Sequence, residues 1–145
     1  MRPKKVLVPV NGSTVDEEAI RLSCQLAKKA GGKIYVTYVI QVDRTLPLDA
    51  EVGPQIERAE QILGQAERIA EEEDCDVETD PLQAREIGPA VVEDAIERGV
   101  DLITIGISYK REFGEFSLGT IIPYVLKNAP CRVLIYREPI PGEER

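Results

Sequence analysis

Short apolar runs alternate with longer amphipathic segments along most of this chain, and this alternation restricts the possible folds more than any other feature. The runs have the length and β-branched content of buried strands, while the longer segments repeat apolar residues at helical spacing. Strands that alternate with such helices form right-handed βαβ units around a parallel sheet. The sequence therefore predicts an α/β fold, a single-domain five-stranded parallel sheet with helices on both faces. The expected strands are 5–10, 33–40, 76–82, 100–105 and 131–136, and the expected helices lie between 14 and 31 and at 52–74, 86–99 and 118–128.

Three of these elements carry further expectations. The apolar positions of helix 52–74 would also suit a coiled-coil seam, but their small size favours packing on the sheet. Strand 76–82 is more polar and ends near Pro81, which is typical of a sheet edge. In helix 86–99 the residues expected to face the core are Val91, Val92, Ala95 and Ile96.

The chain length of 145 residues suits one domain, 1–145, that buries a core without disulfides or metals. Its core is expected at 5–137, with a flexible tail at 138–145. No stretch has the length of a signal-peptide core or a membrane span, which favours a cytoplasmic protein. The three cysteines are widely spaced and form no C-x-x-C pair, so we expect small thiols rather than a zinc site or disulfide framework.

Charge and composition exclude several functions. The net charge of -8 argues against partners such as nucleic acid or an anionic membrane, because both attract clustered Lys and Arg. The chain has no histidine, so it cannot assemble a Ser-His or Cys-His nucleophile. We therefore predict no catalytic residue and no protein metal site.

The loop after the fourth expected strand is the first candidate site. Gly106 would let the chain turn off the strand, and Gly119 and Thr120 open a helix whose N-terminal N–H groups attract anions. Lys110 and Arg111 add two cations, and the Thr120 hydroxyl could bind a phosphate oxygen or a phosphate-bound Mg²⁺. The alternative is an ordinary surface loop with a capped helix.

The loop after the first expected strand is the second candidate. The amide of Asn11 can bond sugar hydroxyls, or it can simply make the turn and cap the next helix. In a sheet of order 3-2-1-4-5 the two loops lie side by side where the winding reverses, which is where such folds bind ligands. The chain has neither a Walker G-K-[ST] nor a G-x-G-x-x-G after its first strand.

The chain resembles the universal stress protein family over residues 5–136. The ATP-binding branch of that family has the motif G-x2-G-x9-G-[S/T], and Gly106, Tyr109, Gly119 and Thr120 fall at the same spacing. The resemblance implies a Rossmann-like, adenine nucleotide alpha hydrolase-like fold that binds ATP, AMP or another adenine nucleotide, with or without Mg. The matching segments are V-L-V-P-V-N-G-S at 6–13, R-E-I-G-P-A at 85–90, D-L-I-T-I-G at 101–106, L-G-T at 118–120 and V-L-K-N-A-P-C-R-V-L-I at 125–135.

The resemblance also implies a role for each matching residue. The implied roles are adenine pairing by the backbone around Val39, adenine packing by Pro9 and Val10, ribose contacts by Asn11 and Gly106, and phosphate binding by Gly119, Thr120 and the Ile121 amide.

Two residues depart from the family pattern. Tyr109 replaces the second motif glycine, and a positive φ there would cost about 1–3 kcal/mol of strain. Asn11 replaces the usual aspartate, which keeps an acceptor and loses a charge; N-G-[S/T] openings also resemble transporter-associated stress domains. Lys110 and Arg111 could compensate for these two departures by supplying positive charge.

Three functions follow. The first is a homodimeric, nucleotide-binding regulatory protein of the stress response, paired through its last strand at 131–136, in which binding matters more than turnover. The second is an interaction module whose pocket is closed by Tyr109. The third is a slow ATP hydrolase. A phosphoacceptor receiver domain is excluded because Asn11 stands where an acidic cluster would be required.

Overall fold

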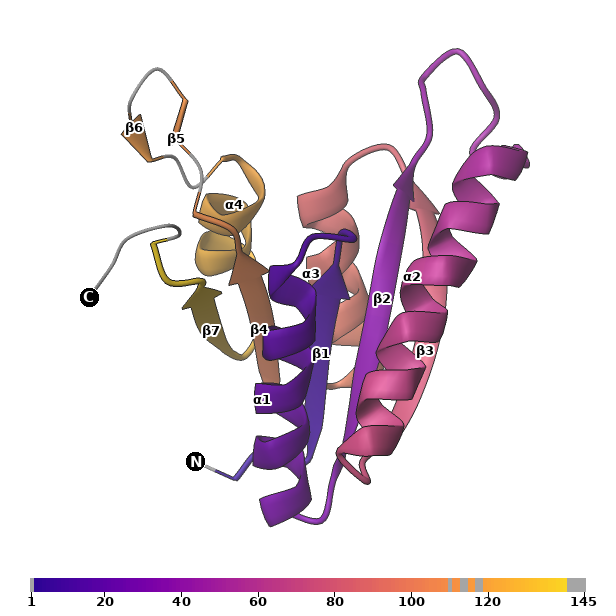
Figure 1. The fold of residues 1–145 in the computed structure, drawn as a ribbon. Helices are drawn as coiled ribbons and strands as arrows, with labels where there is room; N and C mark the ends of the chain where they lie inside the picture. The colour runs from indigo at the N-terminus through magenta and orange to yellow at the C-terminus, as the bar shows by residue number, and fades with distance from the viewer. Residues whose placement is uncertain (1, 110, 113–114, 117–118, 141–145) are drawn as a thin grey trace.

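The central feature of the fold is a parallel sheet. The computed structural model describes residues 2–109, 111–112, 115–116 and 119–140. Its five-stranded sheet has the order β3-β2-β1-β4-β7, which confirms the predicted topology (Figure 1). The strands are β1 (Lys5–Val10), β2 (Lys33–Gln41), β3 (Asp76–Ala84), β4 (Leu102–Ile107) and β7 (Arg132–Arg137).

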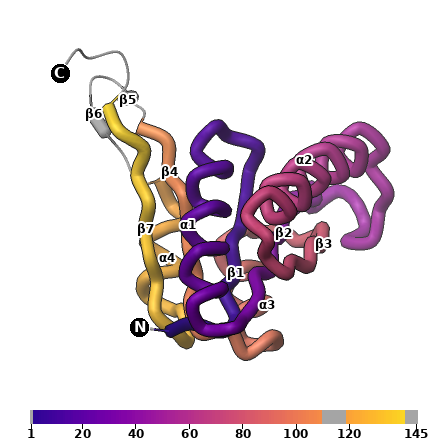
Figure 2. The backbone as a smooth tube through the Cα atoms, turned by 60° about the horizontal axis from the view of Figure 1, so that its bottom comes forward, coloured from indigo at the N-terminus to yellow at the C-terminus, as the bar shows by residue number. Residues whose placement is uncertain are grey.

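Two helices cover each face of the sheet. α1 (Val15–Lys29) and α2 (Gly53–Glu72) lie on one face, and α3 (Ile87–Arg98) and α4 (Ile121–Asn128) lie on the other (Figure 2). Alternate side chains of β1 enter the two cores: Val6 and Val8 pack beneath α1 and α2, whereas Leu7 packs beneath α3 and α4. A strand buried on both faces in this way explains the uninterrupted apolar run.

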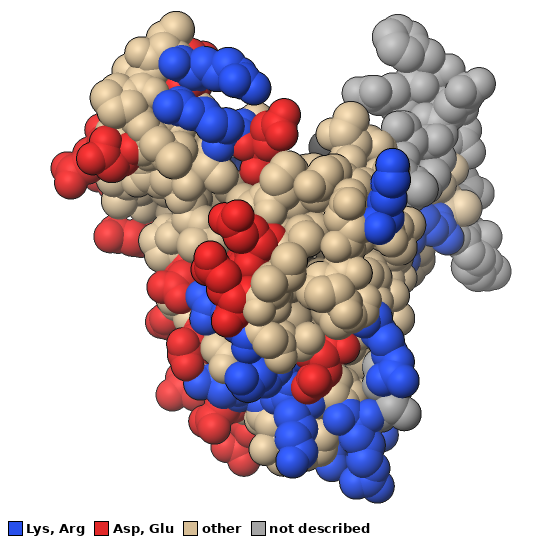
Figure 3. Space-filling model, turned by 180° about the vertical axis from the view of Figure 1, so that it is seen from behind, with Lys and Arg blue, Asp and Glu red and all other residues tan. Residues whose placement is uncertain are grey.

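α2 and α3 settle two of the expectations. The buried residues of α2 join the core formed with α1 and the sheet, as the sheet-packing interpretation predicts. The expectation for Ile96 is wrong, since 59% of this side chain is exposed. Ile96 belongs to α3. On the face opposite to the one seen in Figure 1, Lys and Arg side chains are interspersed with Asp and Glu (Figure 3).

β3 is an edge strand, as predicted, but it continues past Pro81 to Ala84. A proline can remain in a strand at the edge of a sheet because a ladder partner is absent on one side.

The region around β4 differs most from the prediction. β4 starts and ends two residues later than expected, so Gly106 is inside the strand, paired with Tyr136, and does not turn the chain. A Cβ on Gly106 would lie 3.2 Å from the Val15 methyl carbons and from Ala19 Cβ. The glycine therefore allows α1 to cross β4 closely.

The loop after β4 contains two short strands that the sequence did not indicate. β5 (Arg111–Glu112) pairs antiparallel with β6 (Glu115–Phe116). Lys110 lies outside the described residues, so its predicted part in the site has no structural counterpart here. Within the described ranges, no helix is long and apolar enough to cross a membrane.

Candidate functional site

The candidate site is the carboxyl edge of the sheet, where β1 and β4 are neighbours. From these strands the chain leaves to opposite faces, since α1 lies on one side and α4 on the other. The structure brings the loops after both strands to this edge, as predicted from the strand order. This places Pro9, Val10, Asn11, Tyr109 and Thr120 at the same end of the molecule.

The turn after β1 is held by two side chains. Asn11 Oδ1 accepts a hydrogen bond from the Ser13 amide at 3.0 Å, and Asp16 Oδ2 accepts one from the Gly12 amide at 2.7 Å. The Asn11 oxygen therefore makes the turn, which is one of its two predicted roles. Thr14 is the N-cap of α1 but makes no side-chain capping bond, and Asp16 in the first turn bonds the preceding Gly12 amide rather than an N–H of the helix.

Asp16 was not among the predicted site residues. Burial raises the pKa of its carboxyl above the ordinary value, although three backbone amides of the turn act to lower it. The only sequence signal was an acidic residue in the first turn of a helix, which is common for electrostatic reasons alone.

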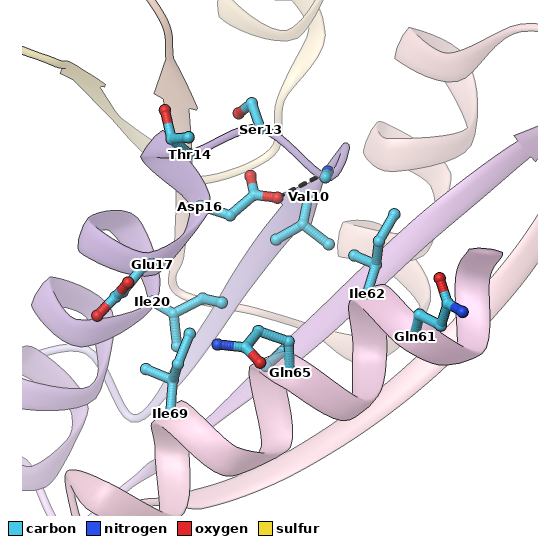
Figure 4. Close-up of a pocket in the computed structure, with 12 residues that line it drawn as sticks. Val10, Ser13, Thr14, Asp16, Glu17, Ile20, Gln61, Ile62, Gln65 and Ile69 are labelled. Carbon is cyan, nitrogen blue, oxygen red and sulfur yellow. Dashed lines mark hydrogen bonds between the residues drawn. The ribbon is translucent and has the colours of Figure 1, made fainter.

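A cavity of about 290 Å³ opens beside Asp16, between α1 and α2. Figure 4 shows Val10, Ile20, Ile62 and Ile69 forming apolar walls, with Asp16 on the α1 side. Of the sequence-predicted residues only Val10 lines this cavity.

A second cavity, of about 380 Å³, lies on the opposite face between the N-terminal ends of α3 and α4. Thr120 and Ile121 line it, together with Gln41 from the end of β2. Thr120 is exposed and is the N-cap of α4, yet it makes no side-chain capping bond. The first-turn N–H groups of α4 lack intrahelical partners and lie at this end of the helix. The start of α4 therefore offers N–H groups to an anion in this cavity, while Glu86, which also lines it, carries a negative charge.

The backbone of Tyr109 does not adopt the positive φ that would cost strain at this motif position. Among the described residues only Asp74 is a non-glycine with positive φ, so Tyr109 carries no left-handed strain. Its amide donates to Glu138 Oε2 at 2.8 Å, and the Arg137 guanidinium lies 5.2 Å from the centre of its ring. The Glu138 amide in turn donates to the Ile107 carbonyl at 3.1 Å. Tyr109 is thus held by the segment that follows β7, a contact that the sequence analysis did not find.

Three further predicted residues have simple structural descriptions. Val39 is buried in β2 and lies one residue beyond the last β1 pair, which is Val10 with Tyr38. Gly119 has a φ of 72°, a value that favours glycine just before α4. Gly106 lies in β4, as described above, and a Cβ added to it would contact residues of α1.

The structure does not gather the predicted residues into one cavity. Val10 faces the α1–α2 cavity, whereas Thr120 and Ile121 line the α3–α4 cavity. The part of the chain that the structure describes holds no group of three His, Cys, Asp or Glu side chains suited to a metal ion.

The strand order, with helices on both faces of the sheet, defines a doubly wound α/β protein. Residues 3–137 match the sequence model of the universal stress protein family. The chain is also 30% identical over 142 residues to universal stress protein MJ0531 of Methanocaldococcus jannaschii, covering 94% of this chain and 83% of that one. The chain belongs to the universal stress protein family.

Solved members of the family share the fold. A universal stress protein from Archaeoglobus fulgidus, in complex with dAMP, matches with a TM-score of 0.74 and 22% identity, covering 93% of this chain and 98% of that one. A universal stress protein in complex with cAMP matches with a TM-score of 0.73 and 21% identity, covering 94% of this chain and 98% of that one. A family member from Arabidopsis thaliana with AMP bound matches with a TM-score of 0.67 and 16% identity, covering 94% of this chain and 93% of that one.

Proposed function

We propose that this protein binds an adenine nucleotide, ATP or AMP, at the carboxyl ends of β1 and β4, and acts as a dimeric regulatory module of the stress response. The observation that carries the proposal is the α3–α4 cavity, which Thr120 and Ile121 at the start of α4 line together with Gln41 at the carboxyl end of β2. Its volume of about 380 Å³ falls in the range of small-molecule pockets. Solved relatives with bound dAMP, cAMP and AMP support the adenine nucleotide class.

In this proposal the phosphates bind at the start of α4. The Thr120 hydroxyl and the Ile121 amide donate to phosphate oxygens, and the helix dipole favours the negative charge. The base and sugar lie toward the ends of β1 and β2, with Pro9, Asn11, Val39 and the backbone of Val10 as their neighbours, since the Val10 side chain faces the α1–α2 cavity. Mg, if it is bound, comes with the phosphates of ATP.

A pair of matched threonines tests the phosphate position. Thr120 and Thr14 are both exposed N-caps at the same edge, and neither makes a side-chain capping bond. Replacing Thr120 by Val removes one hydroxyl and should weaken AMP binding about fivefold to tenfold, the worth of one hydrogen bond. Thr14→Val should leave AMP affinity unchanged, because Thr14 lies at the start of α1 on the other face.

The measurement is isothermal titration calorimetry with AMP, ATP, Mg-ATP and adenosine. Adenosine should bind equally to wild type and T120V, since it has no phosphate. Absence of heat with every nucleotide, together with no adenine absorbance released on denaturation, would refute nucleotide binding and favour the interaction module.

The dimer rests on the position of β7. It is an edge strand of the described sheet, and its central residues 133–136 are only half-buried. An exposed edge of this kind can pair with a second copy. Sedimentation equilibrium should then give twice the mass of one chain.

A further inference from the structure

Two of the three cysteines lie together in the folded protein. Cys24 is fully buried in the middle of α1, and Cys75 packs against the same core from the turn between α2 and β3. The two thiols therefore share one core, where each acts on the pKa of the other, although 50 residues of chain separate them. Cys131 packs in the core on the opposite face of the sheet.

The backbone around Cys75 is fixed. Asp74 has a φ of 55°, which turns the chain out of α2, and the Cys75 amide donates to the Ala70 carbonyl at 2.9 Å. The Cys75 thiol donates to the Asp76 carbonyl at 3.4 Å. These contacts fix Cys75 between the end of α2 and the start of β3.

Ion pairs on either side of the thiols clamp α1 to this turn. Arg21 binds Glu72 at 2.7 Å and Glu73 at 3.0 Å, and Lys28 Nζ donates to the Glu73 carbonyl at 2.9 Å. Arg21 lies three residues before Cys24 and Lys28 four residues after it, so all three share one face of α1. The clamp therefore presents Cys24 to Cys75 before any reaction occurs.

The environments of the two thiols differ. Cys75 is half-buried and lines a surface cavity of about 360 Å³, whereas Cys24 has no solvent exposure. Hydrogen bonding from Cys24 lowers the pKa of the Cys75 thiol, and Lys28 acts in the same direction. The same contact and burial raise the pKa of Cys24. Cys75 is thus the thiol that meets solvent and has the lowered pKa, and Cys24 lies in the core behind it.

The entrance to Cys75 is acidic. Its cavity is lined by Glu67, Glu71, Asp74 and Asp76, with Val77 beside them, and Glu73 also acts on the thiol. Negative side chains at this entrance repel an anionic oxidant such as oxidised glutathione and leave a small neutral oxidant unaffected.

We propose that Cys24 and Cys75 form an oxidisable dithiol site that hydrogen peroxide converts to an intramolecular disulfide. The Cys75 thiolate attacks one peroxide oxygen; an S–O bond forms, the O–O bond breaks, and the hydroxide that leaves takes up the proton lost by Cys75. The Cys24 sulfur then attacks the Cys75 sulfenic acid; an S–S bond forms, the S–O bond breaks, and the second hydroxide takes the Cys24 proton. The two thiols lose two electrons and two protons, and peroxide is reduced to two waters.

The disulfide links α1 to the end of α2 and encloses β2 and α2 in a covalent loop. Restricting so long a loop in the unfolded chain stabilises the folded protein, and the expected rise in Tm is about 10 °C. Reductant should reverse this rise.

The test uses the full chain, treated with hydrogen peroxide and then alkylated. Intact mass should show the loss of two hydrogen atoms, and a non-reducing digest should contain the Cys24 peptide joined to the Cys75 peptide. The matched control C131S should give the same product and the same rise in Tm. C75S should abolish both, and because Cys75 is half-buried this variant also covers the case in which C24S fails to fold.

Two results would overturn the proposal, and a third would contradict the charge selectivity of the entrance. One is peroxide-treated protein in which Cys75 has become a sulfinic acid while Cys24 can still be alkylated after unfolding. Another is a disulfide that includes Cys131. The third concerns the acidic entrance: cationic cystamine should oxidise the pair faster than oxidised glutathione at low salt, and equal rates would contradict that selectivity.

Discussion

Gly106→Ala is the substitution that most directly tests how the site region is built. The glycine lies in β4 beneath α1, and the added methyl would meet Val15 Cγ1, Val15 Cγ2 and Ala19 Cβ, each at 3.2 Å. Ordinary carbon–carbon contacts are about 3.5–4.0 Å, so α1 or β4 must shift by several tenths of an ångström. The family resemblance instead attributes this glycine to close approach of a nucleotide, and the two explanations predict different results.

The cost follows from overpacking a well-filled core, about 1–3 kcal/mol. Loss of glycine's freedom in the unfolded chain offsets about 0.4–1 kcal/mol of this. The net destabilisation should be about 1–2 kcal/mol. With about 2.1 cal/mol/K of unfolding entropy per residue, Tm should fall by about 3–6 °C.

A double-mutant cycle measures the contact itself. Val15→Ala removes the two methyl groups that the new side chain strikes, so G106A/V15A should be at least about 1 kcal/mol more stable than additivity predicts. Val91→Ala is the matched control, since Val91 is equally buried but lies in the core on the other face. Urea unfolding gives each free energy. A G106A protein as stable as wild type, or one that is additive with V15A, would refute the packing explanation.

Two further predictions concern a glycine pair and a buried carboxyl. A Cβ on Gly32 would lie 2.1 Å from the Lys4 carbonyl oxygen. A Cβ on Gly31 would meet no atom within 4 Å, so only the φ of 70° disfavours a side chain there. Gly32→Ala should therefore cost about 3 kcal/mol or more and Gly31→Ala only about 1 kcal/mol in urea unfolding, and the reverse order would contradict the geometry. Burial raises the pKa of Asp16, so the folded protein binds this proton more tightly than the unfolded chain, and acidification through the folded-state pKa favours folding. The stability of wild type relative to Asp16→Asn should accordingly rise as the pH falls from about 7 to 4. A flat or falling difference would show that burial does not raise the pKa of Asp16.

The fold could be predicted because its signals are local. The run at β1 is apolar on both faces because both cores bury it, and the glycine after α3 has the left-handed φ of 64° that ends a helix. The start of β4 was misplaced because Asp101 looked like part of the strand. Its carboxylate instead accepts hydrogen bonds from the Lys4 and Lys5 amides at 2.9 and 3.0 Å, a contact across the sheet that the sequence does not indicate.

The candidate site was predictable in position but only partly in detail. Strand order alone placed the loops after β1 and β4 together, and the motif spacing marked Gly119 and Thr120. Asp16 and Glu138 were missed because each acts through a bond to a backbone amide. The Cys24–Cys75 contact was missed for a related reason, since it depends on how α1 meets the end of α2.

Tyr109 shows why a motif position cannot be judged by residue type alone. Glycine differs from other residues in two ways: it tolerates positive φ, and it has no side chain. In this chain the first property is not needed, because the Tyr109 backbone is outside the left-handed region and its amide is held by Glu138. Tyrosine therefore costs no backbone strain, and only the second property remains relevant. The Tyr109 ring lies against the Arg137 guanidinium at the end of β7, so this pairing holds the side chain that the motif glycine lacks.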